Sequence, residues 1–125
     1  MKPGKSGLAR IIDATGYSIS GIKAAYSGEA AFRQELLLAL ILGAASFWLA
    51  RTVTEWLLLI LPVFVLLIVE LLNSAIESVV DRVGDDFHEL SGRAKDMGSA
   101  AVLIALIIAA LVWASVLIEQ PPSIF

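Results

Sequence analysis

The sequence predicts an all-helical integral membrane protein in which one surface helix precedes three transmembrane helices. The 125 residues are 58% hydrophobic and only 17% charged, and the mean hydropathy is +0.85. A soluble domain of this length cannot bury so much apolar surface. Three apolar runs can each form a helix that crosses a hydrocarbon core of about 30 Å. An amphipathic segment comes before them, and we expect residues 1–125 to form one membrane domain.

The first expected element is a surface helix over about residues 6–27. Arg10 and Asp13 point away from its apolar stripe, as is typical of a helix lying on a membrane surface. Gly16 and Gly21 each disfavour a helix by about 1 kcal/mol, so a hinge is the alternative. The stripe consists of side chains at helical spacing, namely Leu8, Ile11, Ile12, Thr15, Ile19, Ile22 and Tyr26.

The three expected spans cover about residues 30–50, 56–80 and 97–118. The uncharged residues 36–50 give only about 22 Å of helix, so the first span must begin near Ala30, with Arg33 reaching towards the headgroups. Pro62 can kink the second span without ending it. The third span carries no charge, and residues 119–125 are expected to form a flexible tail.

Basic residues predict the orientation of these spans. Five Lys or Arg residues precede the first span and three lie in the segment 81–96, whereas one lies in 51–55 and none follow the third span. The positive-inside rule then places the N-terminus in the cytoplasm and the C-terminus outside. The net charge of −3 argues against a nucleic-acid partner, and the absence of cysteine excludes disulfides and thiolate metal sites.

A ladder of polar residues on one face of the second span is the most informative feature. At 100° per residue the ladder shares one side of the helix over about 16 Å. Charged residues inside a span cost at least about 2.5–3.5 kcal/mol each, so they need partners or a function. The structural alternative is pairing with Arg or Lys of neighbouring helices. The members are Glu70, Asn73, Ser74, Glu77 and Asp81.

Complementary groups lie near the same end of the spans. Glu29 and Glu35 flank the start of the first span, and Arg93, Lys95 and Asp96 precede the third. Several carboxylates beside a few cations suit metal-assisted phosphate chemistry, because carboxylate oxygens bind Mg²⁺. The alternative is that the segment 81–96 is only a solvated loop.

The sequence of this region resembles the signature of the prokaryotic integral-membrane diacylglycerol kinases. The resemblance is carried by ELLNSAIE at residues 70–77, VVDR at 79–82 and HELSGRAKDMGSAAV at 88–102. EAAFRQE at 29–35 and segments around Arg10 and Tyr17 also match, whereas residues 51–55 and the termini do not. The resemblance implies a homotrimer in the bacterial inner membrane, with active sites shared between subunits. It also implies Mg²⁺-dependent transfer of the ATP γ-phosphoryl group to diacylglycerol, which gives phosphatidate.

The resemblance further implies roles for individual residues. Glu70 would be the general base, Asn73 would hold it or the phosphate, and Lys95 would neutralise phosphoryl charge. Glu29 and Glu77 would bind the metal. Nucleotide contacts would come from Arg10, Tyr17, Glu29, Glu77, Asp81, Lys95 and Asp96. Substrate contacts would come from Arg10, Glu35, Glu70 and Ser99.

Alternatives remain for several of these roles. Glu77 could pair structurally with Arg33 or Lys95, and Arg10 could bind lipid headgroups. Tyr17 could be an interfacial anchor, and Asp81 a plain carboxylate at a helix end. For the whole protein, the alternatives are an undecaprenol kinase and a non-enzymatic trimer that conducts protons or ions.

Overall fold

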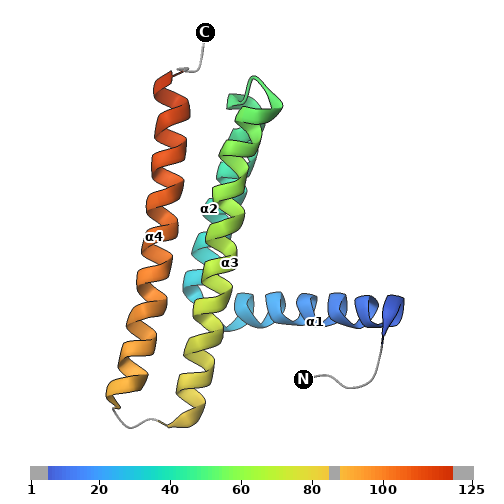
Figure 1. The fold of residues 1–125 in the computed structure, drawn as a ribbon, viewed down its shortest axis with the longest axis vertical. Helices are drawn as coiled ribbons and strands as arrows, with labels where there is room; N and C mark the ends of the chain where they lie inside the picture. The colour runs from blue at the N-terminus through green and yellow to red at the C-terminus, as the bar shows by residue number, and fades with distance from the viewer. Residues whose placement is uncertain (1–5, 85–87, 120–125) are drawn as a thin grey trace.

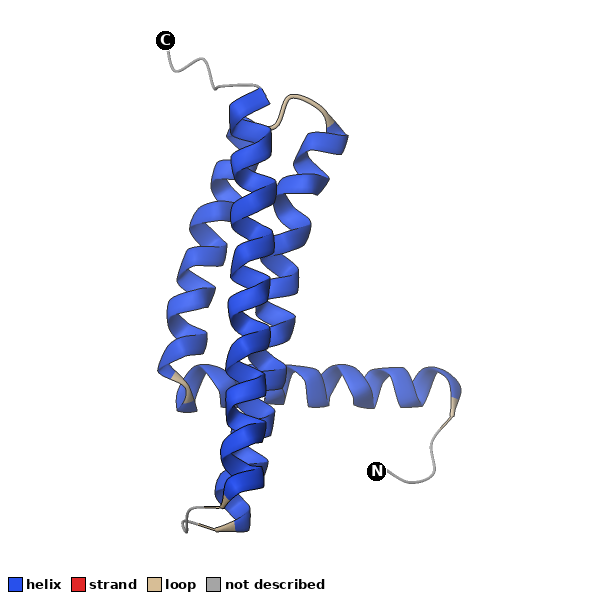
Figure 2. Ribbon diagram, turned by 60° about the vertical axis from the view of Figure 1, so that its left-hand side comes forward, coloured by secondary structure: helices blue, strands red, loops and turns tan. Residues whose placement is uncertain are grey.

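The computed structural model describes residues 6–84 and 88–119, and within them the chain forms four α-helices and no strand. The helices are α1 (Gly7–Gly28), α2 (Ala30–Leu49), α3 (Val53–Val83) and α4 (Glu89–Glu119). α2, α3 and α4 run side by side, and α1 lies crosswise to them (Figures 1 and 2). This arrangement confirms the expected all-helical fold. The expected tail lies outside the described residues from position 120 onwards.

α1 continues through both of its internal glycines as the expected single helix, and the alternative of a hinge at Gly16 or Gly21 is not observed in it. The large apolar side chains of its stripe remain exposed, from 48% at Ile22 to 72% at Leu8. No part of the described chain covers them.

The chain turns from α1 into α2 at Glu29, which has an extended backbone (φ −125°, ψ 109°). The Glu29 N–H donates to the carbonyl oxygen of Ala25 at 3.0 Å. Arg33 Nη1 donates to the carbonyl oxygen of Tyr26 at 2.7 Å, and so satisfies an acceptor that the end of α1 leaves open. These bonds fix the crosswise helix to the bundle.

α3 is the central helix, and its first two thirds form the core. Buried apolar side chains line this part, with Leu59 fully buried and Leu66 only 1% exposed. α3 passes through Pro62 without ending. A proline weakens hydrogen bonding in the turn before it, and there the indole Nε1 of Trp113 in α4 donates to the Leu59 carbonyl oxygen at 2.9 Å.

The segment 81–96, expected as a loop, is largely helical, which corrects the sequence-based boundary. α3 ends at Val83 and α4 begins at Glu89. The length of a span limits how much helix lies in lipid, but a helix continues into water where its residues favour it. His88 then caps α4, because its Nδ1 accepts a hydrogen bond from the Leu90 N–H at 3.1 Å.

Among the described residues, three helices are long and apolar enough to cross a membrane, namely α2, α3 and α4. The end of the bundle where α3 and α4 connect, formed by residues 70–83 and 89–98, is called the loop end below. The polar residues singled out in the second span all lie at this end.

Candidate active site

The polar ladder of α3 runs from the protein interior to the surface. Glu70, Asn73 and Ser74 are buried, with exposed fractions of 3%, 9% and 6%. Glu77 is half-buried, and Asp81 is exposed. The shared face expected from the sequence therefore points into the protein at its deep end and opens to the surroundings one turn later.

Hydrogen bonds within the ladder join residues four positions apart. Ser74 Oγ donates to Glu70 Oε1 at 3.5 Å, and Asn73 Nδ2 donates to Glu77 Oε1 at 3.4 Å. Both bonds are long, and Asn73 Oδ1 is buried without a hydrogen-bond partner. The ladder consequently keeps acceptor capacity that a bound substrate could use.

A second carboxyl group meets the ladder from α2. Glu35 is half-buried, and its carboxyl group lies against that of Glu70. Its Oε2 atom is buried without a hydrogen-bond partner. Two acidic groups side by side in an apolar bundle are costly for folding, and such arrangements are retained chiefly for function.

Lys95 of α4 brings a cation to the outer end of the ladder. Its Nζ lies 2.8 Å from Asp81 Oδ1, with side chains 44% and 66% exposed. The negative charge of the Glu77 carboxylate also attracts the Lys95 ammonium. An exposed pair of this kind contributes little to stability, so the Lys95 ammonium can exchange Asp81 for a phosphate at small cost.

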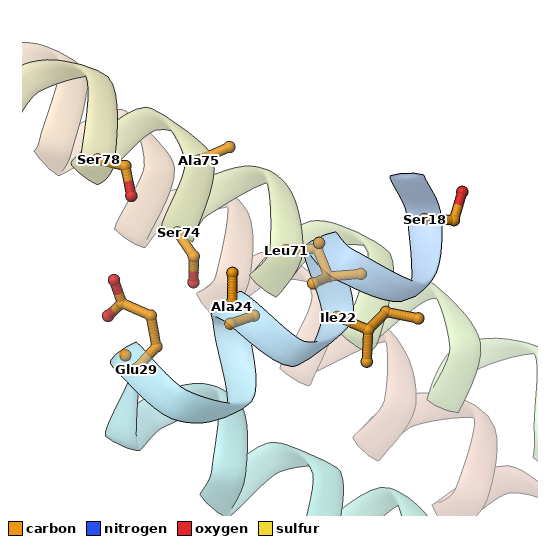
Figure 3. A pocket seen from close by; sticks show the side chains of 11 residues that line it. Ser18, Ile22, Ala24, Glu29, Leu71, Ser74, Ala75 and Ser78 are labelled. Atoms are coloured by element: carbon orange, nitrogen blue, oxygen red, sulfur yellow. The ribbon is translucent and has the colours of Figure 1, made fainter. Parts of the chain in front are cut away.

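A cavity of about 530 Å³ lies between α1 and α3, beside the turn that leads into α2. Its volume falls within the range of small-molecule sites. Glu29 lies on one side of it, and Ser74 and Ser78 of α3 lie on the other (Figure 3). The cavity thus lies beside the α1–α2 turn and meets the ladder at Ser74.

Four of the expected site residues do not face the ladder of their own chain. Asp96 falls about 160° around α4 from Gly98, which faces α3. Ser99 is exposed on α4, and Arg10 and Tyr17 are exposed on α1, which projects away from the bundle (Figure 1). The remaining expected residues lie in the loop end or beside it on α2 and the α1–α2 turn: Glu29, Glu35, Glu70, Asn73, Glu77, Asp81 and Lys95.

Sequence reasoning missed two contributions to this region. Ser78 lines the cavity, and its spacing of four from Ser74 could have placed it there. Gly98 touches Asn73 across the α3–α4 contact, and no pattern in the sequence indicates this pairing.

Glu29 and Glu77, the expected metal ligands, are both half-buried. Within residues 6–84 and 88–119, no three His, Asp or Glu side chains gather as a metal site. Mg²⁺ is commonly held by only one or two carboxylates together with substrate phosphates and water. Two carboxylates are therefore enough only for an ion that substrate phosphates and water also hold.

Comparison with known proteins points to one family. Residues 16–117 match the family model described as prokaryotic diacylglycerol kinase. The chain is 56% identical over 108 residues to a diacylglycerol kinase of Escherichia coli, covering 86% of this chain and 88% of the relative. It is 51% identical over 112 residues to one from Haemophilus influenzae, covering 90% and 95%. The diacylglycerol kinase of Pseudomonas aeruginosa is also 51% identical, over 115 residues, covering 92% and 94%.

Proposed function

The chain belongs to the prokaryotic diacylglycerol kinase family, and we propose that its reaction takes place at the loop end, around the polar ladder of α3. It is a multi-pass membrane enzyme that phosphorylates diacylglycerol with ATP. The observation that carries the proposed location is the buried Glu70, which shares its face with Asn73, Ser74 and Glu77 and lies one helical turn from the cavity wall at Ser74.

Glu70 is the proposed general base. As the diacylglycerol hydroxyl oxygen attacks the γ-phosphorus, the hydroxyl proton passes to the Glu70 carboxylate. The bond from the γ-phosphorus to the β–γ bridging oxygen breaks, and ADP leaves with that electron pair. The products are phosphatidate and ADP. A carboxylate on a spanning helix near the loop end suits a lipid hydroxyl that stays at headgroup depth.

Asn73 and Lys95 orient the reacting groups in this proposal. Asn73 donates to Glu77 and has a free Oδ1, so it can hold either the ladder or a substrate. Lys95 leaves its exposed partner Asp81 and neutralises charge on the transferred phosphoryl group.

Glu29 and Glu77 would hold Mg²⁺. The ion would neutralise phosphate charge and help to align the triphosphate. The chain's own contribution is placement, because Glu29 comes from the α1–α2 turn and Glu77 from the half-buried part of the ladder.

The outward-facing residues fit a homotrimer in which neighbouring subunits complete each site. Arg10 precedes Glu29 by a length of helix of about 28 Å, so it lies far from the ladder of its own chain. We assign Arg10, Tyr17 and Asp96, with Asp81, to nucleotide contacts. We assign Glu35 and Ser99, with Arg10, to substrate contacts.

The proposed orientation places the N-terminus and the loop end in the cytoplasm, where ATP is available, and the C-terminus outside the bacterial inner membrane. The excess of basic residues before α2 and between α3 and α4 supports it. Trp48 and Trp56 lie at the opposite end, where aromatic residues favour the interface.

A labelled-ATP assay with a panel of lipid alcohols tests this function. We expect label in phosphatidate when diacylglycerol is the acceptor, and none after Mg²⁺ is removed by chelation. Preference for undecaprenol would show that the acceptor is wrong. Ion flux through reconstituted vesicles without lipid phosphorylation would support the non-enzymatic alternative.

A further inference from the structure

Gly98 of α4 lies buried directly against Asn73 of α3. A β-carbon at position 98 would overlap Asn73 Oδ1, and it would stand 3.2 Å from Asn73 Cγ and 3.8 Å from Asn73 Cβ. Gly98 lies within α4, and its φ is not positive. What glycine provides here is space rather than backbone freedom, since alanine favours a helix more than glycine does.

The space at Gly98 determines where the Asn73 amide can lie. On one side the amide reaches along α3, where Nδ2 donates to Glu77 Oε1 at 3.4 Å. On the other side, Oδ1 sits in the position that a β-carbon of residue 98 would take, buried and without a hydrogen-bond partner. The amide is therefore held between a carboxylate of its own helix and the bare backbone of the next helix.

The surroundings offer the amide no polar alternative on the α4 side. Asn73 and Gly98 line a hollow of about 390 Å³ between α3 and α4. The other residues that line it are Val69, Leu72, Ile76, Ala94, Met97 and Ala101. An amide pushed away from Gly98 would turn among these apolar groups or change its approach to Glu77.

We propose that Gly98 is a positioning residue for the kinase reaction, because the missing side chain lets α4 hold the Asn73 amide in the orientation that reaches Glu77. This inference rests on the proposed function of Asn73 and Glu77. In the proposed mechanism, Gly98 itself touches neither nucleotide nor lipid.

The test is the variant Gly98→Ala. The overlapping atom, Oδ1, is at the tip of a side chain that can rotate, so we expect folding, oligomeric state and thermal midpoint to stay close to those of the unmodified enzyme. We expect kcat to fall about 10- to 100-fold, as displaced positioning groups commonly cause. The Mg²⁺ concentration for half-maximal activity should rise, because Glu77 loses its orienting donor.

Gly43→Ala is the matched control. Gly43 lies in α2, and a β-carbon there would make an ordinary contact with Ile60 Cδ1 at 3.7 Å. Its kcat and Mg²⁺ requirement should not change. The side-chain amide resonance of Asn73 in an NMR spectrum should shift in Gly98→Ala and stay in place in Gly43→Ala.

A double variant separates positioning from a general packing effect. In an Asn73→Ala background, adding Gly98→Ala should lower kcat no further, because the displaced amide is already absent. A further loss of the same size, or an unmodified kcat in Gly98→Ala alone, would overturn the inference. If Asn73→Ala itself keeps full kcat, the proposed role of Asn73 fails. If Asn73→Ala is impaired while Gly98→Ala is normal, only the role of Gly98 fails.

Discussion

Glu70 lies one helical turn beyond Leu66, at nearly the same depth in the protein. Leu66 is 1% exposed and Glu70 is 3% exposed, so a buried carboxyl group directly follows the apolar core along α3. The nearest polar groups are the Ser74 hydroxyl, at 3.5 Å, and the carboxyl group of Glu35. These partners compensate little of the cost of burying an acid, which supports a catalytic role over a purely structural one.

The sequence indicated the ladder because helical spacing alone fixes which residues of one helix share a face. Contacts between helices were not predictable in the same way. Asn73 meets Gly98 and Asp81 meets Lys95 only because α3 and α4 pack in one particular register. That register depends on side-chain fit along the whole contact, which no local pattern encodes.

Glu77→Gln tests the proposed metal ligand at the residue scale. The amide keeps the size of the side chain but loses the charge that Mg²⁺ prefers. We expect the Mg²⁺ concentration for half-maximal activity to rise about tenfold or more, a cost of about 1.4 kcal/mol, with kcat partly restored by excess Mg²⁺.

Glu119→Gln is the control for that experiment, since Glu119 is exposed at the far end of α4. Its Mg²⁺ dependence should match the unmodified enzyme. A loss of activity in Glu77→Gln that excess Mg²⁺ does not change would argue against metal binding by Glu77.

At the scale of secondary structure, α3 combines two functions in one helix. Its first part packs the core, and its last part carries the ladder beyond the apolar region. The sequence predicted the apolar part well, because long uncharged runs leave few alternatives. It underestimated the ends of α3 and α4, since charged residues mark where lipid ends and not where a helix ends.

At the turn between α2 and α3, too, the structure contains local order that the sequence analysis did not predict. Residues 51–55 carry none of the motifs by which the sequence resembles the family, although the family model spans them. They nevertheless hold a helix start together. Thr52 Oγ1 accepts from the Glu55 N–H at 3.1 Å, and Glu55 Oε1 accepts from the Arg51 N–H at 3.0 Å. These bonds satisfy open donors at the start of α3.

Thr52→Ala tests this cap. Loss of the hydroxyl should lower the free energy of unfolding by about 0.5–2 kcal/mol, measured by denaturation in detergent, while kcat at the distant loop end stays unchanged. Thr54→Ala is the matched control, because Thr54 is exposed in the same turn and no side-chain bond of the cap involves it. Equal stability of the two variants would contradict the capping role.

At the scale of the whole molecule, a single chain leaves the proposed site residues divided between two regions. The ladder lies in the bundle, whereas Arg10 lies on the projecting part of α1 (Figure 2). The long apolar faces of α2 and α4 are also largely exposed within one chain. Lipid and neighbouring subunits can cover these faces. A sequence alone does not say which of the faces contacts lipid and which contacts a subunit.

Mixed oligomers test whether subunits share sites. We expect Arg10→Ala and Glu70→Gln chains to be impaired alone. If Arg10 acts on the ladder of a neighbour, random mixing of equal amounts in a symmetric trimer leaves about a quarter of the sites intact. Labelled-ATP assays of the mixture should then show that share of the normal rate. A mixture no more active than the separate variants would place both residues in one subunit's site.

The most direct test of the catalytic account is kcat for Glu70→Gln in detergent micelles with saturating ATP, Mg²⁺ and diacylglycerol. Glutamine keeps the shape of the side chain and an oxygen that can accept from Ser74, but it cannot take the hydroxyl proton. We expect kcat to fall about 100- to 10,000-fold, with oligomeric state and thermal midpoint unchanged. A folded Glu70→Gln enzyme with near-normal kcat would contradict it.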